Sequence, residues 1–518
     1  MTENPARFER SAQSLIRELR SMSSPIATPS DGREDRLHDE LCALLLAWDP
    51  RSAAVPDALV QALCELALHR EARQNELGRR LIFAAIAESL GDSFEPDKAA
   101  LYDDLFARVI DYCRHQPAGR ALDLVLSRFG LTSVEGLLAR KAQRTLSRSC
   151  PTSERRRIRR VLVPSRVTLG ADVAVTSVVL QKIERVFPEA ECVVFGPIAV
   201  AELLERTVRR VRFLDVPYQR RGGLMARLDA WVALVDAVQT EITPEAGSCL
   251  LLDPDSRLTQ LGLLPLVHED VPSFFFESRA YRWPDVETLG ELTVRWLDDT
   301  LGADDGGRLY PKVLPAKSLA VAARRVAQQA RASGAGHVTA VTLGVGGNAR
   351  KRIAGCFELE LVRALLSDGG VVILDKGIGE EVARMEAIIA ALAAQGTSVV
   401  ELQATPPALP PGASGQLLVY QGGLRSLVAL VAASDLYVGY DSAFQHVAAA
   451  LAVPVIDVFV NPPNHLFSQR WRPYSKAPVK VVGATDVDGA DTLVRVLAAC
   501  RELRTTAVDR RWLVADPQ

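Results

Sequence analysis

The strongest candidate for chemistry is the segment 440–460, YDSAFQHVAAALAVPVIDVFV. A predicted strand ends at its start, and the chain turns through Asp441, Ser442 and Ala443 into a predicted helix. Small residues at the start of a helix let backbone N–H groups approach a phosphate, and the helix dipole favours its negative charge. Asp441 is also typical of a helix N-cap, and His446 of a histidine packed in a core, so the residues alone leave both interpretations open.

A second candidate is the glycine-rich segment 342–353, TLGVGGNARKRI, which follows another predicted strand. Backbone amides of a flexible turn together with cations suit a diphosphate. The segment lacks the GxxxxGK[ST] spacing of a P-loop, and Ala349 stands where GxGxxG would have its last glycine. A turn with exposed basic side chains is the alternative. Glycines 344, 346 and 347 form the turn, and Arg350, Lys351 and Arg352 follow it. The residues of this segment expected to bind the donor are Gly346, Gly347, Asn348, Arg350 and Lys351.

A carboxylate stands after the first predicted strand of the chain's middle part, in SRVTLGADVAVTS at 165–177. Asp172 lies there at the start of a predicted helix. A general base must lie within hydrogen-bond reach of the acceptor hydroxyl, and a carboxylate beside a ligand cleft could serve. A favourable contact with the helix dipole is the alternative.

Two further groups carry weaker signals. Asp253 and Asp255 form a DxD pair at a strand end, a pattern that can hold Mg²⁺ or Mn²⁺ under a nucleotide diphosphate in a different transferase architecture. Glu277, Tyr281 and Arg282 lie in FESRAYRWPD and could line an acceptor site, since aromatic rings stack on sugars. A turn is the alternative for the first group, and packing for the second. We expect no metal ligand among the site residues.

The elements that must position these residues alternate along residues 155–518. Short β-branched runs such as VLVPSRV, ECVVFG, VTAVTLGV and LYVGYD are separated by amphipathic helices. This pattern predicts an α/β class with doubly wound parallel sheets, in two tandem halves at 155–310 and 311–518. Ligands of such folds bind outside the carboxyl ends of the strands, so a cleft between the halves is expected. The last predicted helix, ADTLVRVLAACRELR, is expected to cross back onto the first half.

Residues 1–150 differ, because their apolar residues recur at helical spacing throughout. This pattern predicts an all-α accessory domain. Since no residue in it is typical of a catalytic site, we expect it to dock an acceptor, a protein partner or a second copy of the chain.

Composition limits the class of protein. The 518 residues include 61 Lys+Arg and 63 Asp+Glu, a net charge of −2, which argues against a polycationic nucleic-acid binder. No apolar run reaches the roughly 18 residues that span a bilayer, and the start lacks the layout of a secretory signal. Eight cysteines without a CxxC pair suit reduced thiols. We expect a cytoplasmic protein, with attachment to the surface of the inner membrane as a further option.

Four segments together resemble glycosyltransferase family 9, the bacterial heptosyltransferase-like enzymes. The resemblance covers roughly residues 155–505, with the block 440–455 as its most specific part. It implies a GT-B fold, in which two Rossmann-like halves face a cleft, here preceded by the helical domain. The four segments are VLVPSRVTLGADVAVTSVVLQKIERVFPEAECVVFG, GGNARKRI, QGGLRSLVALVAASDLYVGYDSAFQHVAAALAVPVI and DVFVNPPNHLFSQRWRPYS.

The resemblance also implies roles for single residues. Asp172 would be the catalytic base, and Lys351 would neutralise the diphosphate of a nucleotide sugar. Asp441 and the amides of 442–446 would hold phosphate and sugar. The donor-binding residues implied in this way are Gly346, Gly347, Asn348, Arg350, Lys351, Gly423, Asp441, Ser442, Ala443, Gln445 and His446.

The activity implied is inverting, metal-independent transfer of a sugar, such as a heptose, from a nucleotide-diphosphate sugar to a hydroxyl group. The acceptor would be a glycan, a lipid-linked molecule or a protein, and no cofactor beyond the donor substrate is expected. Three departures from the family pattern are the extra residue before Asp172, Ala443 in place of glycine and Ile353 in place of an aromatic residue. They leave open a different donor, or a non-catalytic relative that acts as a binding or scaffold protein. A nucleotide-sugar epimerase with the same two-half architecture is a further alternative.

Overall fold

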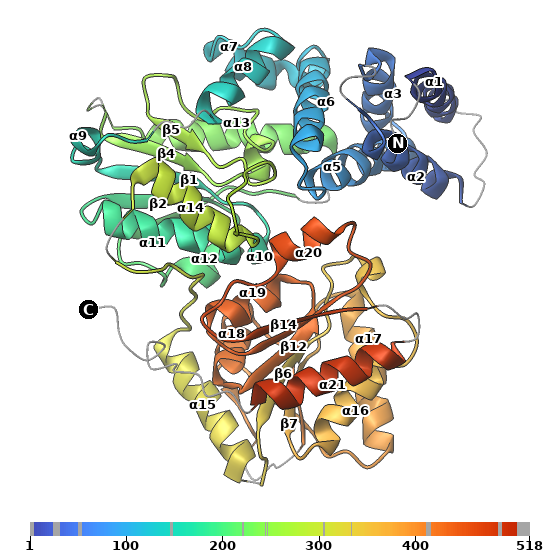
Figure 1. Cartoon of the computed structure of the whole chain (residues 1–518), viewed down its shortest axis with the longest axis vertical. Coiled ribbons are helices and arrows are strands. Elements are labelled where there is room, and N and C mark those ends of the chain that lie inside the picture. The colour runs from blue at the N-terminus through green and yellow to red at the C-terminus, as the bar shows by residue number, and fades with distance from the viewer. Residues whose placement is uncertain are drawn as a thin grey trace.

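The computed structural model divides the chain into a helical domain and two α/β halves (Figure 1). In Figure 1 the helical domain (blue to cyan) lies beside the first half (green), and the second half (yellow to red) lies below both. The residues that the structure describes are 5–23, 32–49, 54–145, 149–219, 222–243, 245, 247–303, 306–332, 334–410, 416–484 and 489–504.

The helical domain is built from amphipathic helices, as the sequence predicts. Their apolar faces meet in one core, and this core continues into residues of the first half such as Trp231 and Leu162. The helices are α1 (Pro5–Met22), α2 (Arg33–Leu46), α3 (Asp57–Ala67), α4 (Ala72–Arg80), the π-helical segment η1 (Leu81–Glu88), α5 (Ser89–Gly91), α6 (Pro96–Arg114), α7 (Arg120–Arg128) and α8 (Val134–Thr145).

The first half contains a five-stranded sheet in the order β3-β2-β1-β4-β5, with every pair parallel. Its central strands β1, β2 and β4 are buried on both faces, which explains their continuous β-branched and aliphatic runs, whereas the edge strands β3 and β5 are only partly buried. The strands are β1 (Arg160–Pro164), β2 (Glu191–Gly196), β3 (Val211–Asp215), β4 (Cys249–Asp253) and β5 (Ser273–Phe275). The helices are α9 (Thr152–Arg155), α10 (Leu169–Ala171), η3 (Asp172–Thr176), α11 (Ser177–Val186), α12 (Ile198–Leu204), α13 (Leu224–Glu241), η4 (Arg257–Thr259) and α14 (Leu289–Leu301).

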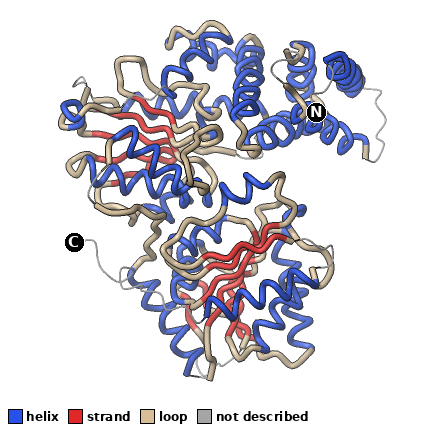
Figure 2. Tube along the Cα trace, in the orientation of Figure 1, coloured by secondary structure: helices blue, strands red, loops and turns tan. Residues whose placement is uncertain are grey.

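The second half contains a seven-stranded parallel sheet in the order β14-β13-β12-β6-β7-β11-β8 (Figure 2). The strands are β6 (Val338–Thr342), β7 (Val371–Asp375), β8 (Val399–Glu401), β11 (Leu417–Tyr420), β12 (Leu436–Tyr440), β13 (Val455–Phe459) and β14 (Val479–Gly483), with β9 (Gln403–Ala404) and β10 (Pro407–Ala408) as a separate pair. The helices are α15 (Lys317–Ala332), η5 (Ala349–Lys351), α16 (Phe357–Ser367), α17 (Glu380–Ala394), α18 (Leu424–Ala433), α19 (Ala443–Ala450), α20 (His465–Trp471) and α21 (Ala490–Arg504).

Two tandem parallel sheets with helices on their faces confirm the predicted α/β class and the GT-B-like arrangement. The expectation for the last helix was wrong. α21 packs on its own half, against α16, β13 and β14, because Val496, Cys500 and Leu503 complete the core there. Among the described residues, no helix combines the length and the apolarity that a membrane crossing demands.

Candidate functional site

The site predicted from the sequence is centred on the carboxyl ends of β6, β12 and β13, which are neighbours in the second sheet. After β6 the chain passes through Gly346 and Gly347, whose φ angles of 61° and 85° favour glycine over other residues. The Asn348 side chain then accepts a hydrogen bond from the Arg350 N–H at 3.2 Å. This turn starts η5 and carries Lys351 toward the end of β12.

Lys351 and Asp441, 90 residues apart in the sequence, form an ion pair between Nζ and Oδ2. The Lys351 side chain remains 30% exposed, and its ammonium also lies over the Phe467 ring of α20, 5.3 Å from the centroid. Asp441 does not act as the N-cap of α19, because that position belongs to Ser442 and no side chain caps the helix there. The structure therefore places a cation, a carboxylate and the start of a helix together.

Two buried side chains support Asp441. Gln445 donates from Nε2 to Asp441 Oδ1 at 2.8 Å and is fully buried. The His446 ring packs edge-on against Trp471, with 5.8 Å between the centroids. Burial, assisted by the nearby Lys351 charge, lowers the pKa of His446 to about 3. At neutral pH His446 therefore carries no positive charge to offer a phosphate.

Gly423 lies further along the same edge, after β11, which is separated from β12 by β7 and β6. It is exposed and precedes α18, and its carbonyl accepts a hydrogen bond from Tyr420 Oη at 2.9 Å. Two strands, β7 and β6, therefore separate Gly423 from the strand that precedes Asp441. Donor binding by Gly423 stays a prediction.

Asp172 follows β1 in the first half, and its carboxylate is fully buried. It accepts hydrogen bonds from Ser165 Oγ at 2.8 Å, the Arg166 N–H at 2.8 Å and Thr176 Oγ1 at 2.7 Å. Burial raises its pKa, and these hydrogen bonds oppose that shift. In this arrangement the carboxylate has no surface that an acceptor hydroxyl can reach, so its role as the base stays a prediction.

The two halves meet beside Asp172. A Cβ on Gly170 would lie 3.0 Å from Ala443 Cα and 3.1 Å from His446 Cδ2, so α10 touches the start of α19. The three places singled out in the sequence thus surround one contact between the halves. Because that contact is tight, no donor sugar fits between Gly170 and α19 unless the halves move apart.

The residues expected to bind the acceptor each have protein partners. Glu277 pairs with Lys141 of the helical domain at 3.3 Å, and Tyr281 donates from Oη to Asp299 at 2.5 Å. Arg282 donates to the Tyr281 carbonyl at 3.2 Å. Acceptor binding by these residues stays a prediction.

The DxD pair of the sequence serves the packing of the first half. Asp253 is fully buried, pairs with Arg144 at 3.3 Å and caps the following turn through the Ser256 N–H. Asp255 lies between Arg166 and Arg279, at 3.5 and 3.4 Å. The part of the chain that the structure describes holds no group of three or more His, Cys, Asp or Glu suited to a metal ion.

One buried carboxyl group beside the site was missed by the sequence analysis. Asp457 in β13 is fully buried, and neither of its carboxyl oxygens has a hydrogen-bond partner among the described residues. Burial, and the negative charge of Asp441, raise its pKa well above the ordinary value, while Lys351 opposes the shift. The signal was present in the sequence, because a lone aspartate interrupts the apolar strand VPVIDVFV.

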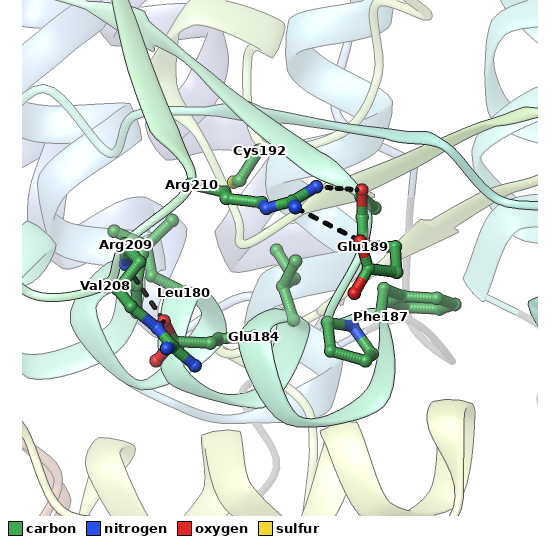
Figure 3. A pocket seen from close by; sticks show the side chains of 11 residues that line it. Leu180, Glu184, Phe187, Glu189, Cys192, Val208, Arg209 and Arg210 are labelled. Atoms are coloured by element: carbon green, nitrogen blue, oxygen red, sulfur yellow. Dashed lines mark hydrogen bonds and ion pairs between the residues drawn. The ribbon is translucent and has the colours of Figure 1, made fainter. Parts of the chain in front are cut away.

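A surface pocket of about 200 Å³ lies elsewhere, at the amino ends of β2 and β3 (Figure 3). Its rim carries two ion pairs, Arg209 with Glu184 and Arg210 with Glu189 (Figure 3). Because the candidate residues sit at the carboxyl ends of the strands, this pocket is on the opposite edge of the first sheet and takes no part in the site.

Comparisons with known proteins match the same region. Residues 416–490 match the family model described as glycosyltransferase family 9 (heptosyltransferase). No curated protein matches the chain.

Several solved structures resemble about two thirds of the chain. A family 9 glycosyltransferase from Veillonella parvula DSM 2008 is 14% identical, with 67% of this chain and 97% of that one covered and a TM-score of 0.46. The E. coli heptosyltransferase WaaC with ADP is 16% identical, with 66% and 99% covered and a TM-score of 0.45. The E. coli ADP-heptose lps heptosyltransferase II is 18% identical, with 67% and 98% covered and a TM-score of 0.44.

The family match spans β11, α18, β12, α19, β13 and α20, and so includes Asp441 and the helix that follows it. It confirms the resemblance read from the sequence motifs. The segment that builds this edge of the second sheet matches the model of glycosyltransferase family 9, the heptosyltransferase family.

Proposed function

We propose that the protein transfers a sugar from a nucleotide-diphosphate sugar to a hydroxyl acceptor with inversion, using neither a metal ion nor a resident cofactor. The observation that carries the proposal is the Lys351–Asp441 ion pair at the start of α19. Asp441 and α19 lie inside the segment that matches family 9, and Lys351 precedes that segment in the chain. A cation and the amino end of a helix at one place suit the negative charge of a departing diphosphate.

The ion pair suggests how the donor binds. In the free protein the Lys351 ammonium pairs with Asp441, and a bound diphosphate would replace Asp441 as its ion-pair partner. Asp441, still held by Gln445, would then be free to accept hydrogen bonds from the donor's hydroxyl groups. Arg350, which is exposed on η5, supplies a second cation for the leaving group. These charges do the work that a metal ion does in other transferases.

The proposed reaction is a single displacement. The acceptor oxygen forms a bond to the anomeric carbon, the bond to the diphosphate oxygen breaks, and a base takes the hydroxyl proton. Asp172 is the proposed base, and the 165–172 turn must separate from α19 for its carboxylate to be reached. The burial of Asp172 favours one alternative, a protein that binds nucleotide sugars without turning them over.

A thermal-shift screen tests donor binding. Wild type, Lys351→Ala and Lys480→Ala are heated with ADP-, GDP-, UDP- and dTDP-sugars, since a ligand that binds only the native state raises the melting temperature. Lys480 of β14 is the matched control, because it also forms an ion pair, with Glu502 of α21 at 2.7 Å, but away from the site. We expect at least one sugar nucleotide to stabilise wild type and Lys480→Ala but not Lys351→Ala. No shift for wild type with any of them would contradict the proposal.

A second pair of variants separates the enzyme from the binding protein. Asp172→Asn keeps the shape of the side chain and removes the base, so we expect normal donor binding with turnover lost. Asp270→Asn, an exposed position in the first half, serves as the control. Full turnover by Asp172→Asn would exclude this residue as the base, and absence of turnover in wild type with every donor and acceptor would favour the binding protein.

A further inference from the structure

The helical domain reaches the candidate site through the turn Gly91–Glu95 between α5 and α6, here called the bridging turn. Phe94 in this turn is 1% exposed, yet it does not belong to the core of the helical domain. It belongs instead to the apolar cluster shared by the two α/β halves. Among the described residues of 5–145, Phe94 is alone in joining that cluster.

On the side of the second half, the bridging turn holds α20. Asn464 donates from Nδ2 to the carbonyl oxygens of Asp92 and Ser93, at 3.3 and 3.4 Å, and its Oδ1 caps α20 by accepting from the Phe467 N–H at 2.8 Å. The Phe94 ring lies 6.5 Å from the rings of both Phe467 and Trp471. In Figure 1, α20 lies between the helical domain and the second sheet.

The two aromatic residues of α20 that Phe94 contacts are the same ones that touch the candidate donor site. Lys351 lies over Phe467, and His446 packs against Trp471. A shift of α20 would therefore move the surroundings of the Lys351 ammonium and of the first turns of α19.

On the side of the first half, the bridging turn pairs with Arg279. The Arg279 guanidinium donates to Asp92 Oδ1 at 3.1 Å and lies so close to Gly91 that a Cβ there would be 2.6 Å from a guanidinium nitrogen. Arg279 also pairs with Asp255, which in turn pairs with Arg166. The Arg166 N–H is one of the hydrogen-bond donors to Asp172.

We propose that the bridging turn is a positioning element of the transferase site, with Phe94 setting α20 against Lys351 and His446, and Asp92 supporting the charged chain that leads to Asp172. The helical domain is then an integral part of the unit that binds the diphosphate of the donor. This inference rests on the proposed function for its ligand. It goes beyond the expectation that the domain docks an acceptor, a protein partner or a second copy of the chain.

Two measurements test it, with three variants of the full chain. Phe94→Ala removes the ring, and Phe94→Leu restores an apolar side chain of similar length. Phe106→Ala is the matched control, since Phe106 is also 1% exposed but packs inside the helical core against Tyr102 and Phe83. A general loss of stability in the helical domain affects Phe94→Ala and Phe106→Ala alike, whereas loss of positioning affects Phe94→Ala alone.

The first measurement is calorimetric titration with inorganic pyrophosphate, which shares the diphosphate chemistry of the donor. We expect Phe94→Ala to bind about tenfold more weakly than wild type, the loss that corresponds to about 1.4 kcal/mol. Phe94→Leu and Phe106→Ala should bind like wild type. Equal affinity for wild type and Phe94→Ala would overturn the inference. If wild type binds no pyrophosphate, the proposed function fails, and the second measurement decides the inference.

The second measurement needs no ligand. Amide hydrogen exchange reports local opening of single segments. In Phe94→Ala we expect faster exchange in α20 and at the start of α19, while Phe106→Ala should speed exchange only within the helical domain. Unchanged exchange of α20 in Phe94→Ala would overturn the inference, whatever the titration shows.

Discussion

The buried carboxyl group of Asp457 makes a quantitative prediction about stability. Asp457 lies in β13 opposite Gly439 of β12, with no exposed surface and no hydrogen-bond partner for either oxygen among the described residues. Burial and the charge of Asp441 raise its pKa well above 3.8, and Lys351 opposes the shift only in part. The folded protein therefore keeps a proton on Asp457 at a pH where the unfolded chain has lost it.

The sign of the effect follows from the raised pKa. Below pH 4 the carboxyl group is protonated in both states, and its titration does not affect stability. Above pH 4 the folded state must retain a proton that the unfolded state releases, so stability falls as pH rises toward the folded pKa. While the pH lies between the unfolded and the folded pKa of Asp457, the loss is about 1.4 kcal/mol for each pH unit. Asp457→Asn cannot ionise and escapes this loss.

The assay compares melting temperatures of Asp457→Asn and wild type at pH 4, 5 and 6. For a domain of about 200 residues the melting temperature of the variant should gain on that of wild type by about 3 to 6 °C for each pH unit below the folded pKa of Asp457. Asp270→Asn, at an exposed position, is the control and should show no such trend. A difference that stays constant with pH, or one that favours wild type at pH 6, would refute the reasoning and mean that Asp457 is ionised in the folded protein.

Three other expectations follow from the site and its surroundings. Gly170→Ala should destabilise the protein by about 1 to 3 kcal/mol, because the new Cβ would lie 3.0 Å from the backbone of α19. Gly423→Ala is the control, because a Cβ there has no neighbour within 4 Å. Equal melting temperatures for wild type and both variants would contradict the contact. The His446 ring should show no titration by NMR between pH 5 and pH 8, since its pKa is about 3, and a midpoint in that range would contradict its burial. Arg144→Ala leaves the buried Asp253 carboxylate without its ion-pair partner. The free energy of unfolding, measured by denaturant titration, should fall by about 3 to 5 kcal/mol. Arg425→Ala, which breaks the more exposed pair with Glu205, should cost about 1 kcal/mol or less, and equal losses in the two variants would contradict the difference in burial.

The parts of the fold that sequence reasoning predicted are those written in local patterns. Strands such as β6 and β12 are continuous apolar runs, and the residues that follow them, including Lys351 and Asp441, must lie at one edge of a parallel sheet. Their position at a common edge could therefore be predicted without knowing the strand order, but their proximity could not, since Gly423 follows β11 at the same edge and β7 and β6 separate it from β12. The ion pair itself is consistent with that prediction, but it forms only because η5 brings Lys351 close to Asp441 after β12.

The parts that could not be predicted depend on contacts between distant segments. Asp172 lies near the start of a helical segment, which begins at Leu169, but tertiary packing decides whether its carboxylate faces a cleft or contacts Ser165 and Thr176. From the sequence, Glu277 looks like a ligand-binding residue. In the structure it pairs instead with Lys141 of the helical domain, a contact that no local pattern predicts. Phe94 lies in a short turn between helices, and nothing local shows that its ring leaves its own domain for another.

The charges around the site bear on which ligands it can bind. Lys351 is neutralised by Asp441, while His446 is uncharged and the raised pKa of Asp457 favours its protonated form. An incoming anion must therefore displace Asp441 from the ammonium, and the displaced carboxylate then repels it. A ligand with two phosphates offers more charge to Lys351 and Arg350 than one with a single phosphate, and its sugar hydroxyl groups give Asp441 new hydrogen-bond donors. The same ion pair should thus select against free monophosphate and favour a diphosphate that carries a sugar.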